Sequence, residues 1–182
     1  MKAITRAEVS MAIGVVVVVG SLIGSIYYGL ANRRVQSMVE SDLEAVEAAV
    51  LAFYEEYRVL PTMYPDYFDF RYGLEGDVKN NEIMNALQAL DAAGNIEHAV
   101  NSRQIVYIRI PKAGKKQSGL NQDGIFVDPW GEEYQIVLDT DGNEVCAMED
   151  TPYNRAVGKR IAIWSKGPDG KLFTWDDMKS WQ

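Results

Sequence analysis

Residues 4–57 read ITRAEVSMAIGVVVVVGSLIGSIYYGLANRRVQSMVESDLEAVEAAVLAFYEEY, and this stretch decides the fold. Its residues 9–30 form a run of 22 residues without a charged side chain. As an α-helix rising ~1.5 Å per residue, that run spans roughly 33 Å, enough to cross a bilayer core of about 30 Å. The Tyr27-Tyr28 pair lies near one end, where aromatic rings favour the membrane interface. The sequence therefore predicts a transmembrane helix over residues 9–30.

Beyond this run, hydrophobic residues continue at spacings of three and four, which place them on one face of a helix. They are Val35, Val39, Leu43, Val46, Val50, Phe53 and Tyr57. No Gly or Pro interrupts residues 31–60, so we expect one continuous helix over residues 4–57. Its second half should pack on a soluble domain, with Val46, Val50 and Phe53 in the core. A membrane anchor followed by a separate helix, and a coiled-coil stalk, are the alternatives.

The composition limits the classes of partner. Of 182 residues, roughly 120–150 remain for soluble structure, which is the size of one domain. The net charge is −8, and residues 35–182 alone hold 14 basic and 25 acidic side chains, net −11. Nucleic-acid binding needs clustered Lys and Arg, so this balance argues against it, whereas it is compatible with divalent cations. A single cysteine, Cys146, allows no intrachain disulfide.

The remainder of the chain predicts a small mixed domain. Pro61 and Pro65 should end the long helix in an aromatic-rich loop. A second helix is predicted over residues 81–93, with Ile83, Leu87 and Leu90 facing inward. Residues 103–110 are predicted to form a strand or an extended edge. Strands are expected over residues 133–138 and 160–165, with residues 144–148 pairing back as a hairpin after the turn at 139–143.

Three weaker signals favour structural readings. Asp139-Thr-Asp141-Gly-Asn resembles the start of a calcium loop, but its Gly comes early and position twelve is Asp150, so a hairpin turn is preferred. The single His98 has no second histidine and no nearby cysteine, which favours a surface or packing role over metal binding. No nucleophile–base arrangement, phosphate loop or dinucleotide motif is present, so we do not expect an enzyme.

The N-terminus carries a family resemblance. Ala3-Ile4-Thr-Arg-Ala-Glu8 resembles the processing motif of type IV prepilins and type II secretion pseudopilins, with Ala3 and Ile4 where glycine and phenylalanine are usual. The resemblance implies that residues 1–3 are a leader, which a prepilin peptidase removes before Ile4, whose new amine is methylated. It also implies that Glu8, an ionisable group at the start of the predicted span, pairs with the N-terminal amine of a neighbouring subunit.

The C-terminal part resembles the major, G-type pseudopilin of type II secretion. The motifs are Asp128-Pro-Trp-Gly131, Ser165-x-Gly-x-Asp-Gly170 and Asp176-Asp-x-x-x-Trp181. The resemblance implies an α+β, type IV pilin-like fold, with a long N-terminal helix packed on a small antiparallel β-sheet. It also implies one Ca²⁺ in the C-terminal loop, held by Asp169 with Asp176 or Asp177. From composition alone, a polar turn is the alternative for these acids.

The implied function is that of a non-enzymatic filament subunit. Such a chain would be a single-pass protein of the bacterial inner membrane, with its N-terminus cytoplasmic and residues 58–182 forming a periplasmic domain. Its partners would be further copies and other pseudopilins, the prepilin peptidase and the inner-membrane secretion platform, in a periplasmic pseudopilus that supports protein export. The alternative is a membrane-anchored, extracytoplasmic calcium-binding module that does not polymerise.

Overall fold

The computed structural model describes residues 6–64, 69–73, 78–148 and 153–181. Side chains are described from Leu30 onward, apart from those of residues 31, 154 and 157 and of the gaps. The processing residues Ala3 and Ile4 therefore lie outside the described residues, as does the side chain of Glu8. The chain divides into two compact units, Met1–Ser37 and Met38–Gln182.

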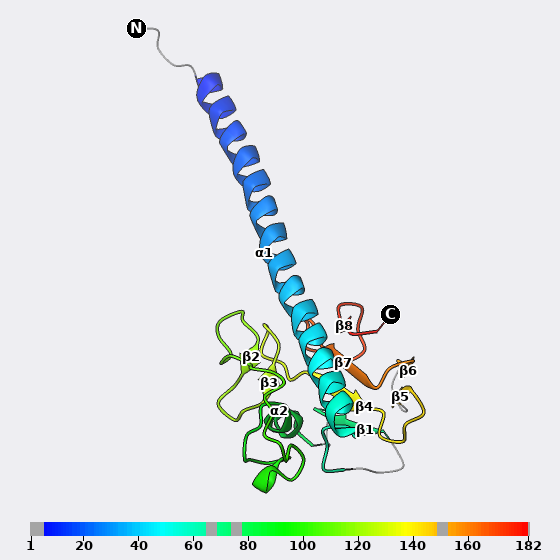
Figure 1. Cartoon of the computed structure of the whole chain (residues 1–182). Coiled ribbons are helices and arrows are strands. Elements are labelled where there is room, and N and C mark those ends of the chain that lie inside the picture. Colours follow the sequence, from blue (N-terminus) through cyan, green and yellow to red (C-terminus); the bar gives the residue numbers. More distant parts are fainter. Residues whose placement is uncertain (1–5, 65–68, 74–77, 149–152, 182) are drawn as a thin grey trace. The chain divides into compact units, whose positions relative to one another are not determined.

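A single helix, α1 (Arg6–Tyr57), runs for 52 residues, as the uninterrupted sequence predicts (Figure 1). It ends at Tyr57 because Arg58 adopts a positive φ of 58°, and the Arg58 N–H donates to the carbonyl of Tyr54 at 2.8 Å. Within the described part of the chain, no helix combines the length and the hydropathy of a membrane span. The predicted span, residues 9–30, lies outside the residues with described side chains except for Leu30.

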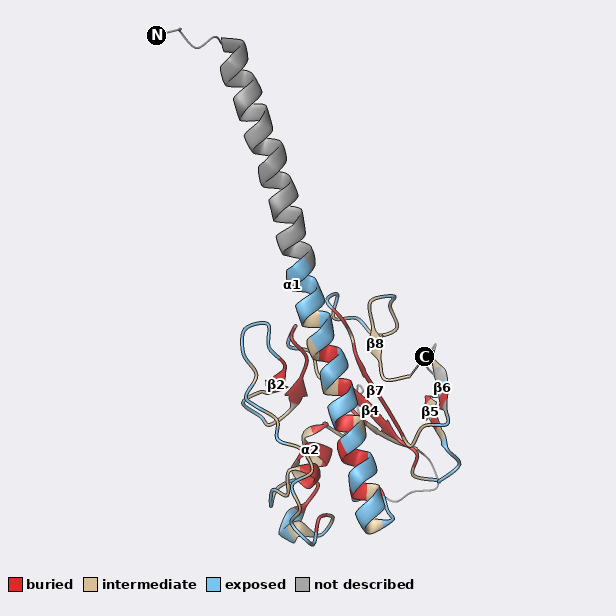
Figure 2. Cartoon of the chain, turned by 45° about the horizontal axis from the view of Figure 1, so that its top comes forward, coloured by how far each residue is buried: buried red, intermediate tan, exposed pale blue. Residues whose placement is uncertain are grey.

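The helical stripe is confirmed over the second half of α1. Five of its members are at most 3 % exposed: Val39, Leu43, Val46, Val50 and Phe53. Figure 2 shows buried residues recurring on the face of α1 that meets the sheet, with exposed residues between them. Burying one such side chain contributes about 1.5–3 kcal/mol relative to leaving it in water. The packing of α1 on the sheet therefore organises the domain.

The sheet under α1 has four antiparallel strands in the order β1-β4-β7-β8. Their bounds are β1 (Phe70–Tyr72), β4 (Gln135–Leu138), β7 (Ile161–Ser165) and β8 (Met178–Lys179). In the β4–β7 pair, Ile136 lies opposite Ile163 and Leu138 opposite Ile161, and all four side chains join the core beneath α1. Alternate residues of the same strands face the other side of the sheet, as strand geometry requires.

That second face is covered by a hairpin of β5 (Val145–Met148) and β6 (Asn154–Val157). Cys146, Met148 and Ala156 of the hairpin pack there against a smaller core with Trp164 of β7. Because both faces of the sheet are covered, every residue of β7 is buried. The rest of the domain comprises α2 (Asn81–Leu87), the short 3₁₀ turn η1 (Ile96–His98), and the pair β2 (Gly119–Leu120) and β3 (Phe126–Val127).

Two expectations from the sequence are wrong, and a third is narrowed. The second helix ends at Leu87 rather than at residue 93, because Ala89 takes a left-handed φ of 57°; Leu90 is consequently 46 % exposed. Of the two predictions for residues 103–110, the strand is excluded: Gln104 has a φ of 54°, and the N–H of Tyr107 donates to the carbonyl of Leu87 at 2.9 Å. Residues 145–148 pair with β6 and not back onto residues 133–138.

Asn80, the residue before α2, holds this helix in place within the domain. It occupies the N-cap position, but its side chain makes no capping bond. Its amide instead donates to the carbonyls of Phe126 (2.8 Å) and Tyr134 (2.9 Å) and accepts from the Phe126 N–H at 2.8 Å. This buried amide satisfies backbone groups of two segments distant in sequence, which fixes α2 beside them.

Candidate functional site

At the start of the C-terminal loop between β7 and β8, the last residue of β7 is hydrogen-bonded to a buried carboxylate, that of Asp128. Asp128 Oδ1 accepts the N–H groups of Trp130 (2.9 Å) and Glu132 (3.0 Å), and Oδ2 accepts the Ser165 hydroxyl at 2.5 Å. Ser165 Oγ in turn accepts the Gly167 N–H at 3.0 Å. Burial raises the pKa of Asp128, and its hydrogen bonds from Ser165, Glu132 and Trp130 act in the opposite direction. The turn at residues 128–131 and the end of β7, two segments singled out in the sequence, are thus joined.

Close backbone approach closes the same loop. Gly167 has a φ of 66°, and a Cβ atom at this position would lie 2.3 Å from the carbonyl oxygen of Asp176. A side chain therefore cannot be accommodated without moving the loop. This contact brings the Asp169 segment against Asp176: the N–H of Asp169 donates to Asp176 Oδ2 at 3.1 Å.

The three acids predicted to bind calcium converge on one hydroxyl. Thr174 Oγ1 lies 2.7 Å from Asp176 Oδ1, 3.2 Å from Asp177 Oδ1 and 3.4 Å from Asp169 Oδ1. A threonine hydroxyl has a single proton to donate, so it can satisfy one of these carboxylates at a time. The hydrogen bond from Thr174 lowers the pKa of Asp176. The loop therefore gathers the predicted ligands around Thr174, and each of them also accepts a backbone N–H, Asp169 from Lys171, Asp176 from Asp169 and Asp177 from Phe173.

Asp177 differs from its two neighbours because it is tied back into the domain. Its Oδ2 accepts the Tyr153 hydroxyl and, at 2.8 Å, the N–H of Phe173. Tyr153 belongs to an aromatic cluster with Trp164, Phe173 and Trp181, each ring meeting it edge-on. Of the two alternatives left open in the sequence, Asp176 is therefore the less constrained partner for Asp169.

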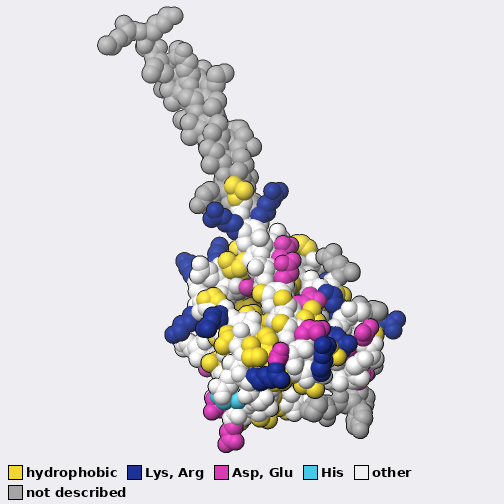
Figure 3. Space-filling model, in the orientation of Figure 1, with side chains coloured by type: hydrophobic (Ala, Val, Ile, Leu, Met, Phe, Trp, Pro, Cys, Tyr) yellow, Lys and Arg dark blue, Asp and Glu magenta, His cyan; other side chains and the backbone are white. Residues whose placement is uncertain are grey.

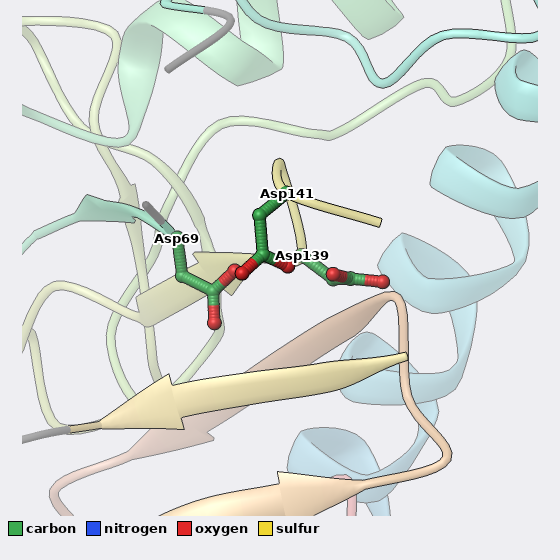
Figure 4. A group of neighbouring side chains, drawn as sticks. All are labelled: Asp69, Asp139 and Asp141. Carbon is green, nitrogen blue, oxygen red and sulfur yellow. The ribbon is translucent and has the colours of Figure 1, made fainter. Parts of the chain in front are cut away.

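A second acidic group has a tighter geometry. Among the described residues, Asp69, Asp139 and Asp141 form the one set of three potential ligand side chains whose oxygens lie within 4.8 Å of one another. Figure 4 shows Asp69, which precedes β1, facing the two acids of the turn that follows β4. Asp139 is buried and accepts the N–H groups of Asn143 and Glu144, both at 3.0 Å, so it holds the turn that the sequence predicts.

Asp69 is the member of this acidic cluster whose charged form is in the least favourable environment. Its Oδ2 accepts the N–H of Ala147 on β5, whereas Oδ1 is buried without a hydrogen-bond partner. Burial, together with the charges of Asp141 and Asp139, raises the pKa of Asp69 from 3.8 to about 6. Burial also raises the pKa of Asp139, and its contact with Asp141 acts in the same direction. Three carboxylates at this spacing favour either a proton or a cation between them.

Residues 59–63 contribute to a cavity on one side of the segment and to a pocket on the other. On one side, a cavity of about 410 Å³ is lined by both acids of the turn and by Arg58 and Arg160. The Arg160 guanidinium lies over the Tyr54 ring, 4.3 Å from its centroid. On the other side, a shallower pocket of about 300 Å³ is lined by apolar side chains, among them Val59 and Met63, together with Thr62 and polar backbone atoms.

Sequence reasoning singled out Asp139 and Asp141 but missed Asp69. The residue lies in the aromatic-rich loop after α1, and a short strand such as β1 leaves little periodicity to detect. His98, predicted to have a surface or packing role, is partly buried in η1. Comparisons with protein-family models, with curated proteins and with solved structures found no match for this chain.

Proposed function

We propose that this chain is a structural subunit of a pilin-like filament, of the kind formed by type II secretion pseudopilins. The observation that carries the proposal is the 52-residue α1. Its second half packs on an antiparallel sheet, while residues 9–30 hold no charged side chain. In such a subunit, the uncharged first half of the helix would lie in the membrane before assembly and pack against the helices of other subunits afterwards.

In this proposal, the N-terminus carries the assembly chemistry. A prepilin peptidase removes residues 1–3, and the Glu8 carboxylate pairs with the amine of Ile4 in the next subunit. In a low-dielectric setting an unpaired charge is costly, so the pair favours the assembled state over isolated subunits. The domain lies on the periplasmic side of the bacterial inner membrane, and the chain works by assembly rather than by catalysis.

Mass spectrometry of the N-terminus tests this function. In cells with an active prepilin peptidase, we expect a methylated chain that begins at Ile4. Glu8→Ala should insert and be processed like the wild type but form no filaments, and Arg6→Ala in the same segment serves as a control. An intact Met1 in such cells would sink the proposal and favour a membrane-anchored module that does not polymerise.

We further propose that one Ca²⁺ binds in the C-terminal loop, held by Asp169 and Asp176 with Asp177 nearby. The convergence of the three carboxylates on the Thr174 hydroxyl supports it. Calcium takes six to eight oxygen ligands, and carboxylates and loop carbonyls supply them. A bound ion would relieve the repulsion within the loop and close it on the sheet.

Thermal melts of the full chain in detergent, with calcium and with a chelator, test the ion site. Binding to the folded state alone should stabilise it by about 2.7 kcal/mol at a hundredfold excess over Kd. Asp169→Asn should abolish that shift, whereas Asp69→Asn should retain it. An unchanged wild-type midpoint up to millimolar calcium would exclude the site. The reverse pattern in the two variants would place the ion at the acidic cluster of Asp69, Asp139 and Asp141.

A further inference from the structure

The C-terminal loop displays an uncovered indole. Trp175 is 95 % exposed, although its neighbours Thr174 and Asp176 are held by hydrogen bonds within the loop. Tryptophan buries about 150–250 Å² when it is covered, and it is enriched at the centres of protein interfaces. The loop therefore presents a large apolar group on a constrained backbone.

The domain also has an uncovered apolar surface, which follows the C-terminal end of α1. Val59 is 59 % exposed and Met63 is 45 % exposed, and with Ala99 and Val100 they line the shallow pocket of about 300 Å³. We call this surface the helix-end pocket. On the face in Figure 3, hydrophobic side chains lie among charged ones.

The indole and the pocket lie at opposite ends of the domain. Leu138 pairs with Ile161 at the start of β7, and the cavity beside residues 59–62 includes Asp139 and Arg160 at that same end. The loop that carries Trp175 follows the other end of β7. Figures 1 and 2 agree: β8 lies toward one end of the domain, and the C-terminal end of α1 lies toward the other.

A knob and a pocket at opposite ends of one chain cannot meet within that chain. Placed on two copies, they make a head-to-tail contact, which does not close as a two-fold dimer does but repeats from copy to copy, along an open filament where the rotation between copies forms no ring. The charges agree with this arrangement: Asp176 directly follows the indole in the sequence, and Arg58, whose side chain is 69 % exposed, directly precedes Val59 of the pocket. Its ion pair with Glu55 is exposed and so contributes little.

We propose that Trp175 of one copy docks into the helix-end pocket of the next copy in the filament. This inference rests on the proposed function, because the contact is too small to act alone. A stable dimer buries about 1,200–2,000 Å² in total, several times what one indole and its pocket provide. Between subunits already aligned by their helices, the high effective concentration makes the same contact effective.

Cysteine cross-linking in the full chain tests the contact. Cells that make the filament would express Trp175→Cys together with Met63→Cys on separate copies, and membranes would be treated with an oxidant. We expect a cross-linked dimer only when both substitutions are present. Trp175→Cys alone, and Trp175→Cys with exposed Lys115→Cys, are the controls, and buried Cys146 is common to all samples.

Filament yield gives an independent readout. Trp175→Ala should lower the sedimentable filament by about tenfold or more, as expected for the loss of an interface tryptophan. Its melting temperature should match that of the wild type, because the side chain is exposed. Filaments that form without a 175–63 cross-link, a Trp175→Cys chain that cross-links to itself, or an unchanged Trp175→Ala yield would each overturn the contact. If the wild type forms no filament, the proposed function fails, and the contact fails with it.

Discussion

Replacing Asp69 with asparagine should stabilise the domain at neutral pH. The folded-state pKa of about 6 exceeds the ordinary value of 3.8 by roughly two units, which corresponds to about 3 kcal/mol at ~1.36 kcal/mol per unit. Asp69 is only partly buried, so solvent screening reduces this effect, and we expect about 1 kcal/mol. Asparagine retains an oxygen to accept the Ala147 N–H and removes the charge that faces Asp139 and Asp141.

The sign of the pH dependence follows from the raised pKa. The folded state binds the proton more tightly than the unfolded state, so the stability associated with protonated Asp69 is complete below about pH 4 and is lost as the pH rises through about 6. The asparagine variant lacks this loss. The two proteins should therefore melt together below about pH 4, diverge between about pH 4 and 6, and differ by a constant amount above pH 6, with the variant higher by about 2–4 °C at pH 7.5.

Thermal denaturation of both proteins at pH 4.5, 6.0 and 7.5, in chelator, measures this divergence. Exposed Asp123, in the turn at residues 121–124, provides the matched control, since Asp123→Asn should leave the pH profile unchanged. If Asp69→Asn is less stable than the wild type at pH 7.5, the hydrogen bond to Ala147 outweighs the repulsion and the reasoning fails. A constant difference at all three pH values would refute the raised pKa itself.

Two further substitutions test the packing that supports the site. Phe53→Ala should lower the free energy of unfolding by about 3–5 kcal/mol, because the ring is fully buried and stacks on Tyr57 with 4.3 Å between centroids. Urea denaturation measures this change, and a value near zero would mean that α1 does not pack on the sheet. Asp128→Ala should lower the free energy of unfolding by about 2–4 kcal/mol, because it leaves the buried Ser165 hydroxyl and two backbone N–H groups without an acceptor. Ser165→Ala should lower it less. Equal losses in the two variants would contradict the central role of the Asp128 carboxylate.

The long helix and its buried face could be predicted because their signal is local and repeated. The stripe from Val39 to Phe53 needs only a 3.6-residue period, and helix periodicity is the strongest pattern in a sequence. The strands at 135–138 and 161–165 were predicted, with the slightly wider bounds 133–138 and 160–165, for a similar reason: they are short apolar runs with turn residues beside them.

What could not be predicted depends on pairings between distant segments. Residues 145–148 have the composition of a strand, but their sequence does not show which strand they pair with. They pair with β6, and side chains of the resulting hairpin cover the second face of the sheet. Leu90 fits the helical stripe of α2, yet the left-handed turn at Ala89 removes it from the core. The acidic cluster is the clearest example, since Asp69 meets Asp139 and Asp141 only through the pairing of β1 with β4.

The sheet keeps the two acidic groups apart, so their contributions can be measured separately. Asp69 precedes β1 at one edge of the β1-β4-β7-β8 order, and the C-terminal loop precedes β8 at the other edge. Three interstrand steps of about 4.8 Å place these edges roughly 14 Å apart, and the five residues of β7 add an offset along the strand direction. Sites this distant usually contribute additively. The stability changes of Asp69→Asn and Asp169→Asn should therefore sum in the double variant, and a calcium-dependent departure from that sum would mean that one ion influences both edges of the sheet.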